Sequence, residues 1–166
     1  MPTLILLRHA KAVDRMEAED DFERGLTERG RSDAARAAQS LQEAGFQAET
    51  ALVSPSRRTS QTWNVVAQTH GEVPIVNPMA LYHASMDMLE RAALEQYAQS
   101  EAPLIIVGHN PGIGGLAHAY AAKLSCMNKI PPGWPTSALG VFDIVIENGE
   151  IIPKAMVHSF DPKAKT

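Results

Sequence analysis

The stretch Leu4-Ile5-Leu6-Leu7-Arg8-His9-Ala10-Lys11 decides the fold class of this chain. Four apolar residues without polar alternation are typical of a strand buried on both faces of a sheet, as in α/β proteins. Arg8 and His9 then lie just past the carboxyl end of that strand, where open α/β sheets bind their ligands. Leu104-Ile105-Ile106-Val107 is a second such run, and Gly108-His109-Asn110-Pro111-Gly112 follows it. If these two strands are neighbours, His9 and His109 come together.

The rest of the chain alternates between strand and helix patterns. Further strands are expected at residues 50–53 and at 73–76, where Pro74 indicates an edge. Helices are expected from a Thr27 cap to Gly45, over 56–70, over 86–97, and after Asn110 with Pro111 in the first turn. Residues 138–146 and 151–157 predict a hairpin around the Asn148-Gly149 turn. This order predicts one domain over residues 1–166, a three-layer α/β/α fold whose mostly parallel sheet ends in an antiparallel C-terminal hairpin.

Length and composition exclude several classes of protein. The 166 residues are 45% hydrophobic and 20% charged, which suits a soluble domain that needs no metal or disulfide to fold. The net charge of −4 argues against non-specific nucleic-acid binding, which depends on Lys and Arg. The single cysteine, Cys126, excludes an internal disulfide and is expected to be a buried apolar residue. No basic leader or membrane-length apolar run is present, so we expect a cytoplasmic monomer without nucleic-acid or membrane partners.

Arg8, His9, Arg58 and His109 each follow a predicted strand, so all four can gather at one edge of the sheet. Two guanidinium groups match the geometry of a phosphate or carboxylate. A neutral imidazole between them can attack phosphorus while its other nitrogen donates to a backbone carbonyl, and the arginines favour that neutral form. Amides of the helix that Asn110 opens would also face the anion. Without acidic pairs or His/Cys ligand spacing, the pattern predicts phosphoryl transfer without metal or cofactor.

Each of these motifs alone has an ordinary structural explanation, and only their joint position at three strand ends favours a site. We interpret the acidic residues 13–25 as a solvated connection, with a lid over the site as the alternative. Trp63 is expected in the core and Trp134 in loop packing, where it could also wall a substrate pocket. His70, His118 and His158 are expected to pack or to meet solvent.

Four motifs taken together resemble those of the histidine phosphatase superfamily, which has the phosphoglycerate mutase-like fold. They are Leu7-Arg8-His9-Ala10-Lys11, Leu26-Thr27-Glu28-Arg29-Gly30, Ser54-Pro55-Ser56-Arg57-Arg58-Thr59-Ser60-Gln61-Thr62 and Gly108-His109-Asn110-Pro111-Gly112. Their spacing and the short chain look most like the compact SixA-like phosphohistidine phosphatase branch. The resemblance spans nearly the whole chain, and the four motifs in this order are specific.

The resemblance implies a role for each matching residue. His9 would be the nucleophile and would pass through a phosphohistidine intermediate, while Arg8 and His109 would bind and polarise the phosphoryl oxygens. Arg58, the fifth residue of the SPxxR pattern, would be a phosphate ligand, and Arg57 its more exposed neighbour. Asn110 is assigned to the phosphate-binding loop. Thr27 and Gly30 would shape a helix start.

Two departures from the family pattern affect these expectations. Ala10 stands where many members have glycine, a difference known in the SixA-like branch. Many members also carry a glutamate as general acid after the third strand, whereas this chain has Leu81-Tyr82-His83-Ala84. His83 could donate the proton, since an unperturbed histidine titrates near pH ~6.5, or it could be a surface histidine. A missing acid suits phosphohistidine, whose imidazole leaving group can arrive already protonated.

We therefore predict a metal-independent phosphatase that forms a covalent phosphohistidine at His9 and acts on protein phosphohistidine. One alternative is a phosphatase of small phosphorylated metabolites, which an enclosing wall built from residues 13–25 and 126–136 would favour. Another is a non-catalytic module that binds phosphate, although simple anion capture needs no nucleophile. Mutase activity is disfavoured, because only about twenty residues separate Tyr82 from Leu104 and the mutases of this family need longer enclosing loops.

Overall fold

The computed structural model describes residues 2–164, and these form one six-stranded sheet in the order β3-β2-β4-β1-β5-β6. Strands β1, β4, β2 and β3 are parallel, whereas β5 is antiparallel to β1 and β6 is antiparallel to β5. The predicted mixed sheet is therefore confirmed. The strands are β1 (Thr3–Arg8), β2 (Thr50–Val53), β3 (Ile75–Val76), β4 (Leu104–Gly108), β5 (Leu139–Glu147) and β6 (Glu150–Phe160).

The two apolar runs that carry the site motifs are the central neighbours β1 and β4. Their register pairs Leu4 with Leu104 and Arg8 with Gly108, so both strands end at the same level. Every residue of the two runs is buried, as expected for parallel strands that are covered on both faces. This register sets His9 and His109 side by side.

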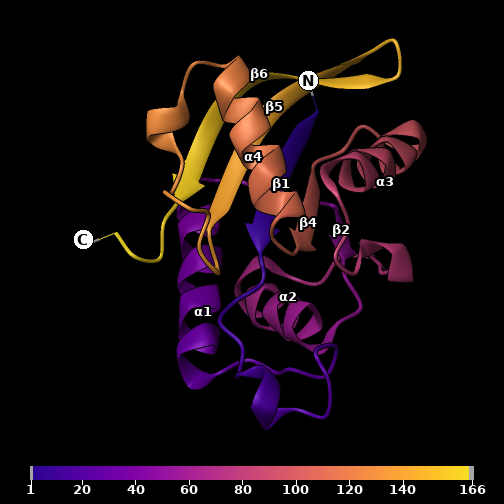
Figure 1. The fold of residues 1–166 in the computed structure, drawn as a ribbon. Helices are drawn as coiled ribbons and strands as arrows, with labels where there is room; N and C mark the ends of the chain where they lie inside the picture. Colours follow the sequence, from indigo (N-terminus) through magenta and orange to yellow (C-terminus); the bar gives the residue numbers. More distant parts are fainter. Residues whose placement is uncertain (1, 165–166) are drawn as a thin grey trace.

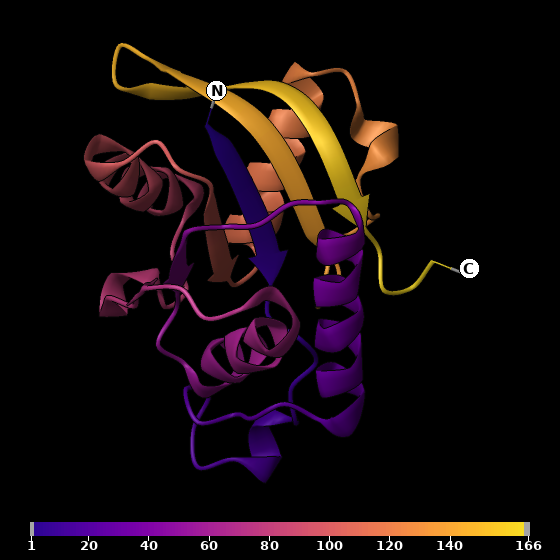
Figure 2. The same ribbon diagram turned by 180° about the vertical axis from the view of Figure 1, so that it is seen from behind.

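Helices cover both faces of the sheet and complete the predicted three layers. In the described part of the chain, α1 (Glu28–Glu43) and α2 (Arg57–His70) lie on one face, and α3 (Met86–Gln99) and α4 (Gly112–Lys123) lie on the other (Figures 1 and 2). Thr27, Ser56 and Ser85 cap the first three helices, each accepting a hydrogen bond from a backbone N–H of the first turn. Thr27 therefore has the structural role that the sequence predicts.

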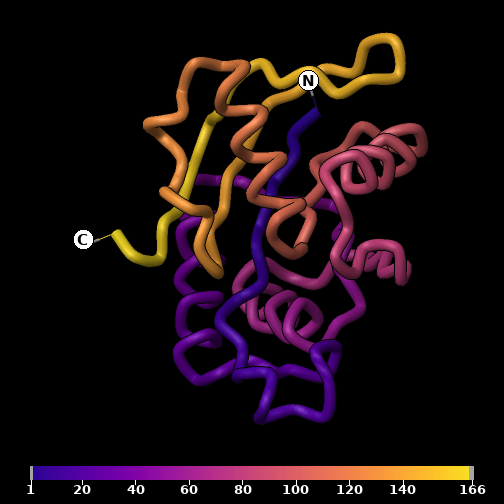
Figure 3. Tube along the Cα trace, viewed as in Figure 1, coloured from indigo at the N-terminus to yellow at the C-terminus, as the bar shows by residue number. Residues whose placement is uncertain are grey.

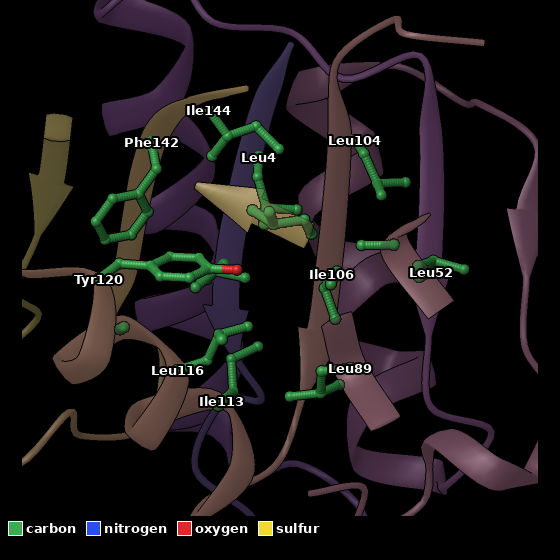
Figure 4. Packing of buried hydrophobic residues seen from close by; sticks show 14 of the residues in the cluster. Leu4, Leu52, Leu89, Leu104, Ile106, Ile113, Leu116, Tyr120, Phe142 and Ile144 are labelled. Atoms are coloured by element: carbon green, nitrogen blue, oxygen red, sulfur yellow. The ribbon is translucent and has the colours of Figure 1, made fainter. Parts of the chain in front are cut away.

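Side chains alternate along the strands between two cores. Leu4 and Leu6 pack with α3 and α4, where Tyr120 and Phe142 are also fully buried (Figure 4). Ile5 and Leu7 pack on the opposite face with α1 and α2, around Trp63. The two cores hold the central strands between the helix layers, and they thereby hold the carboxyl ends of these strands in place.

The C-terminal hairpin has the predicted turn, with Asn148 and Gly149 both at positive φ (53° and 73°). Its second strand extends to Phe160, three residues beyond the predicted end, through two irregularities in the pairing. Short 3-10 turns that the sequence did not indicate lie in the connections at Arg15–Glu17, Met79–Leu81 and Met127–Lys129. No helix within residues 2–164 is long and apolar enough to cross a membrane.

The long connection between β1 and α1 lies near the site. Figure 3 shows its trace leaving the end of β1 and passing beyond α2 before α1 begins. Backbone hydrogen bonds tie this connection to the start of α2, where Arg57 N–H donates to the Phe22 carbonyl (3.0 Å). The connection therefore lies along the carboxyl-end edge of the sheet.

Candidate active site

The structure brings Arg8, His9, Arg58 and His109 together at the carboxyl ends of three strands. Arg8 is the last residue of β1 and His9 directly follows it, His109 directly follows β4, and Arg58 lies in the first turn of α2 after β2. The rings of His9 and His109 lie 5.4 Å apart between centroids, and Arg58 Nη2 lies 3.3 Å from His109 Nδ1. Arg57, the neighbour of Arg58, is exposed, whereas Arg58 is buried.

His9 is held as a neutral imidazole with one nitrogen free. Its Nδ1 lies 2.8 Å from the Ala10 carbonyl oxygen, which can only accept, so Nδ1 carries the proton and Nε2 keeps its lone pair. Burial lowers the pKa of His9 to about 3, with further lowering from the charges of Arg58 and Arg8, while the Ala10 carbonyl opposes the shift. A buried, unprotonated Nε2 is what a nucleophile requires.

The two arginines each keep one buried donor without a partner. Arg8 Nη1 donates to the Trp134 carbonyl (3.1 Å), and Arg58 Nη1 donates to the Asp21 carbonyl (2.8 Å). Within residues 2–164, however, neither Arg8 Nε nor Arg58 Nε has a hydrogen-bond partner. Burial, and then the charge of Arg58, lower the pKa of Arg8. Two such cations beside His9 favour an anion that accepts from both.

His109 has both ring nitrogens engaged. Arg58 can only donate, so His109 Nδ1 accepts from it, and His109 Nε2–H then donates to Ser54 Oγ (2.7 Å). Burial is the main cause that lowers the pKa of His109 to about 2, and the nearby His9 and Arg58 add to it. Because the Ser54 hydroxyl can donate as well as accept, it can support either neutral tautomer of His109.

The acidic connection of residues 13–25 contacts the site and is not only a solvated loop, which corrects its interpretation from the sequence. Asp21 reaches the site, and its Oδ2 accepts from Arg58 Nη2 (3.0 Å) and from the Tyr82 hydroxyl (2.5 Å). His83 Nε2 lies 3.1 Å from the same oxygen. The connection therefore contributes a carboxylate to the wall of the site, which the sequence analysis did not predict.

His83 lies at this wall, with its side chain half exposed and its backbone at φ 55°. Its ring is 4.9 Å from that of His109 and 4.2 Å from that of Tyr82, between centroids. The position fits a group that approaches a ligand from the solvent side of His109. It does not fit an isolated surface histidine, because Asp21 and Tyr82 both contact it.

Asn110 lies at the site, but both ends of its side-chain amide are hydrogen-bonded to backbone groups of the protein. Its Nδ2 donates to the Trp134 carbonyl (3.0 Å), and its Oδ1 accepts from Gly114 N–H in the first turn of α4 (2.9 Å). Trp134 is fully buried, so it contributes its backbone carbonyl rather than its ring to the site. The structure therefore gives Trp134 a packing role, as expected.

The remaining histidines lie outside this cluster. Ala48 N–H donates to His70 Nε2, His118 Nδ1 bonds the Gly114 carbonyl, and His158 Nε2 bonds Ser40 Oγ. Cys126 is buried, as predicted. In the described part of the chain, no three His, Cys, Asp or Glu residues cluster in a way that could hold a metal ion.

Sequence reasoning missed three residues of the site, namely Asp21, Ser54 and Tyr82. Ser54 directly follows β2 and carried the same signal as His9 and His109, a polar residue directly after a buried strand. Tyr82 lies beside His83 in an irregular segment without periodicity. Asp21 is one of six acidic residues between positions 13 and 25, and nothing in the sequence distinguishes it from the other five.

Comparisons with known proteins agree with this geometry. A family model described as the histidine phosphatase superfamily (branch 1) matches residues 4–111. An uncharacterized protein of Picosynechococcus sp. is 35% identical over 123 residues, which cover 71% of this chain and 72% of that protein. A candidate phosphohistidine phosphatase SixA from Agrobacterium tumefaciens matches with a TM-score of 0.74 at 30% identity, over 86% of this chain and 91% of that one. The protein histidine phosphatase SixA complexed with tungstate matches with a TM-score of 0.75 at 20% identity, over 96% and 97%.

Proposed function

Because this chain belongs to the histidine phosphatase superfamily and has a SixA-like fold, it is a phosphatase, and we propose that it hydrolyses protein phosphohistidine through a covalent intermediate at His9. One observation carries the proposal. His9 is buried and neutral with Nε2 free, beside two buried guanidinium Nε–H donors that have no partner within residues 2–164. This combination suits a nucleophile whose target is a phosphoryl group held by Arg8 and Arg58.

In the first step the Nε2 lone pair of His9 attacks phosphorus. The new P–N bond forms as the bond to the leaving atom breaks, and that atom takes the bonding electron pair together with a proton. Arg8 and Arg58 supply the positive charge that the phosphoryl oxygens need, so no metal ion is required for this role. A phosphoryl oxygen between Arg58 Nη2 and His109 Nδ1 would bind both groups once His109 adopts its Nδ1–H tautomer, with Ser54 then donating to Nε2.

In the second step a water molecule attacks the phosphoryl group on His9. The P–N bond breaks, its electron pair returns to Nε2, and inorganic phosphate leaves. We propose His83 as the proton donor of the first step and as the acceptor of the water proton in the second. The position of its ring on the solvent side of His109 supports this role. Asn110 is assigned a positioning role, since both ends of its side-chain amide hold other groups.

The surface around the site supports a protein substrate. A basic groove of about 350 Å³ on one side is lined by Arg8, Lys11 and Arg29, and an apolar groove of about 430 Å³ next to the His109 loop is lined by Met86 and Pro111. A polypeptide that carries the phosphoryl group extends beyond it and offers further groups for such grooves to contact. The protein described as SixA and complexed with tungstate is named a protein histidine phosphatase, which agrees with this substrate class.

The test is dephosphorylation of a histidine-phosphorylated protein in EDTA, with wild type, His9→Ala and, as a control histidine outside the site, His118→Ala. We expect wild type and His118→Ala to release phosphate and His9→Ala to be inactive. A brief reaction stopped in alkali should trap an acid-labile phosphoryl group on wild type and on His118→Ala but not on His9→Ala. Turnover that EDTA abolishes, or that survives in His9→Ala, would contradict the mechanism. Faster turnover of small phosphate esters than of the phosphoprotein would instead favour a metabolite phosphatase.

A further inference from the structure

The Asp21 carboxylate binds four side chains that come from three separate parts of the chain. Its Oδ2 accepts from Arg58 Nη2 (3.0 Å), from the Tyr82 hydroxyl (2.5 Å) and from His83 Nε2 (3.1 Å). Its Oδ1 accepts from Arg24 Nη1 (3.0 Å). No other acidic residue in the described part of the chain makes an ion pair with Arg58. Asp21 is therefore the point at which the acidic connection joins the phosphoryl site.

The segment around Asp21 is anchored and does not merely approach the site. The Asp21 carbonyl accepts from Arg58 Nη1 (2.8 Å), and the Phe22 carbonyl accepts from the backbone N–H of Arg57 (3.0 Å). The Phe22 ring also packs edge-on against Tyr82, with 5.1 Å between centroids. Main-chain and aromatic contacts together hold the carboxylate in place.

His83 depends on Asp21 for its orientation. Within residues 2–164, its contact with Asp21 is the only hydrogen bond of the His83 side chain. Because Nε2 donates to that carboxylate, Nδ1 is the nitrogen left to exchange a proton with a leaving group. Without Asp21, only ring contacts with Tyr82 and His109 would hold the imidazole.

We propose that Asp21 is a positioning residue, which holds the proton donor His83 and the phosphate ligand Arg58 on one carboxylate oxygen. This inference rests on the proposed function and adds a residue to it. It explains how the chain protonates a leaving group although no glutamate follows its third strand. Burial alone would raise the pKa of Asp21, but hydrogen bonds from Tyr82, Arg24 and His83 and the charge of Arg58 lower it well below its usual value. Asp21 therefore stays an anion and acts through His83 rather than as an acid itself.

The experiment compares a substrate that needs protonation with one that does not. Phenyl phosphate has a poor leaving group and p-nitrophenyl phosphate a good one, so loss of a proton donor should lower kcat mainly for the former. Asp21→Asn keeps the shape of the side chain and removes its charge. Asp20→Asn is the matched control, because Asp20 lies in the same connection and, within residues 2–164, its carboxylate accepts only from Glu23 N–H.

We expect Asp21→Asn to lower kcat for phenyl phosphate by at least about tenfold and for p-nitrophenyl phosphate by less than about threefold. Asp20→Asn should change both by less than about twofold. In His83→Ala the added Asp21→Asn change should have no further effect on the ratio of the two rates, since the residues act as one unit. Equal losses on both substrates, or no loss on either, would overturn the inference.

A second measurement separates this inference from the proposed function. The ¹⁵N resonances of the His83 ring report whether Nε2–H donates to a carboxylate, and they require no turnover. We expect them to shift in Asp21→Asn and to stay unchanged in Asp20→Asn. If wild type hydrolyses neither aryl phosphate, the proposed function fails, and these resonances still decide the role of Asp21: identical spectra of wild type and Asp21→Asn refute it.

Discussion

Mild acid should destabilise this protein through the two buried histidines of its site. His9 and His109 are only 7% and 3% exposed, and their pKa values lie at about 3 and about 2 in the folded chain against an ordinary value of 6.5. The lowered pKa shows that the folded chain favours the neutral imidazoles, so their contribution to stability is complete above the pKa that histidine has in the unfolded chain. It is lost as the pH falls from that value toward the folded pKa, because the unfolded chain then binds more protons.

The size of the loss follows from these values. Between about pH 7 and about pH 4.5, each histidine becomes protonated in the unfolded chain and stays neutral in the folded one, which costs about 2.5 kcal/mol. The pair therefore costs about 5 kcal/mol, a large share of the roughly 5–15 kcal/mol of a typical domain. The carboxyl of Asp21, whose lowered pKa also contributes stability, loses that contribution only as the pH falls below its ordinary value of 3.8.

Urea unfolding followed by tryptophan fluorescence at the two pH values measures this loss directly. Wild type should lose about 2.5 kcal/mol more than His9→Gln or His109→Gln, and about 5 kcal/mol more than the double variant. His158, whose pKa burial also lowers, is present in all four proteins and cancels. Equal losses in wild type and the double variant would show that both imidazoles charge without unfolding, and would refute the neutral, buried nucleophile.

Two further predictions each compare a substitution at a buried or closely packed residue with the same substitution at a nearby residue that has more room. Arg58→Ala should weaken vanadate binding by roughly 100-fold in calorimetric titration, because a buried guanidinium is lost. Arg57→Ala, at an exposed position, should change vanadate binding by less than about threefold. Similar losses in both variants would contradict the assignment of Arg58 as the phosphate ligand. Gly112→Ala would bring a Cβ within 2.0 Å of the Ala84 carbonyl oxygen and should destabilise the fold by about 2 kcal/mol in thermal unfolding. The same change at Gly115 meets only the flexible end of Met86 and should cost less than about 1 kcal/mol, so equal costs would argue against the close backbone approach at Gly112.

The features of this protein that could be predicted from its sequence are those that the positions of the strands determine. Unbroken apolar runs such as Leu104–Val107 identify central strands, and the polar residues that follow them must lie at a common edge once the strands are parallel and in register. The fold class, the hairpin and the gathering of Arg8, His9, Arg58 and His109 all depend on this logic. It uses only local patterns and the geometry of a sheet.

The unpredicted part depends on contacts between irregular segments. Asp21 meets Tyr82 and His83 across about sixty residues of sequence, and neither segment has a periodicity that fixes the direction of its side chains. The six acidic residues of the connection are alike in chemistry, and only the contacts of Phe22 with Tyr82 and Arg57 select which of them points toward the site. Such selection is a tertiary effect, so local sequence cannot supply it.

The contacts of Arg8 have a consequence for the order in which the protein becomes active during synthesis. Its guanidinium is held by the Trp134 carbonyl, and Ser137 N–H donates to the carbonyls of Arg8 and His9. β1 comes before β5 in the sequence and is paired with it on one side, so β1 lacks that neighbour until residues 139–147 have left the ribosome. A nascent chain that already contains every residue of the phosphoryl site therefore still lacks the carbonyl that orients Arg8. Catalysis should begin only after the C-terminal hairpin closes on the first strand.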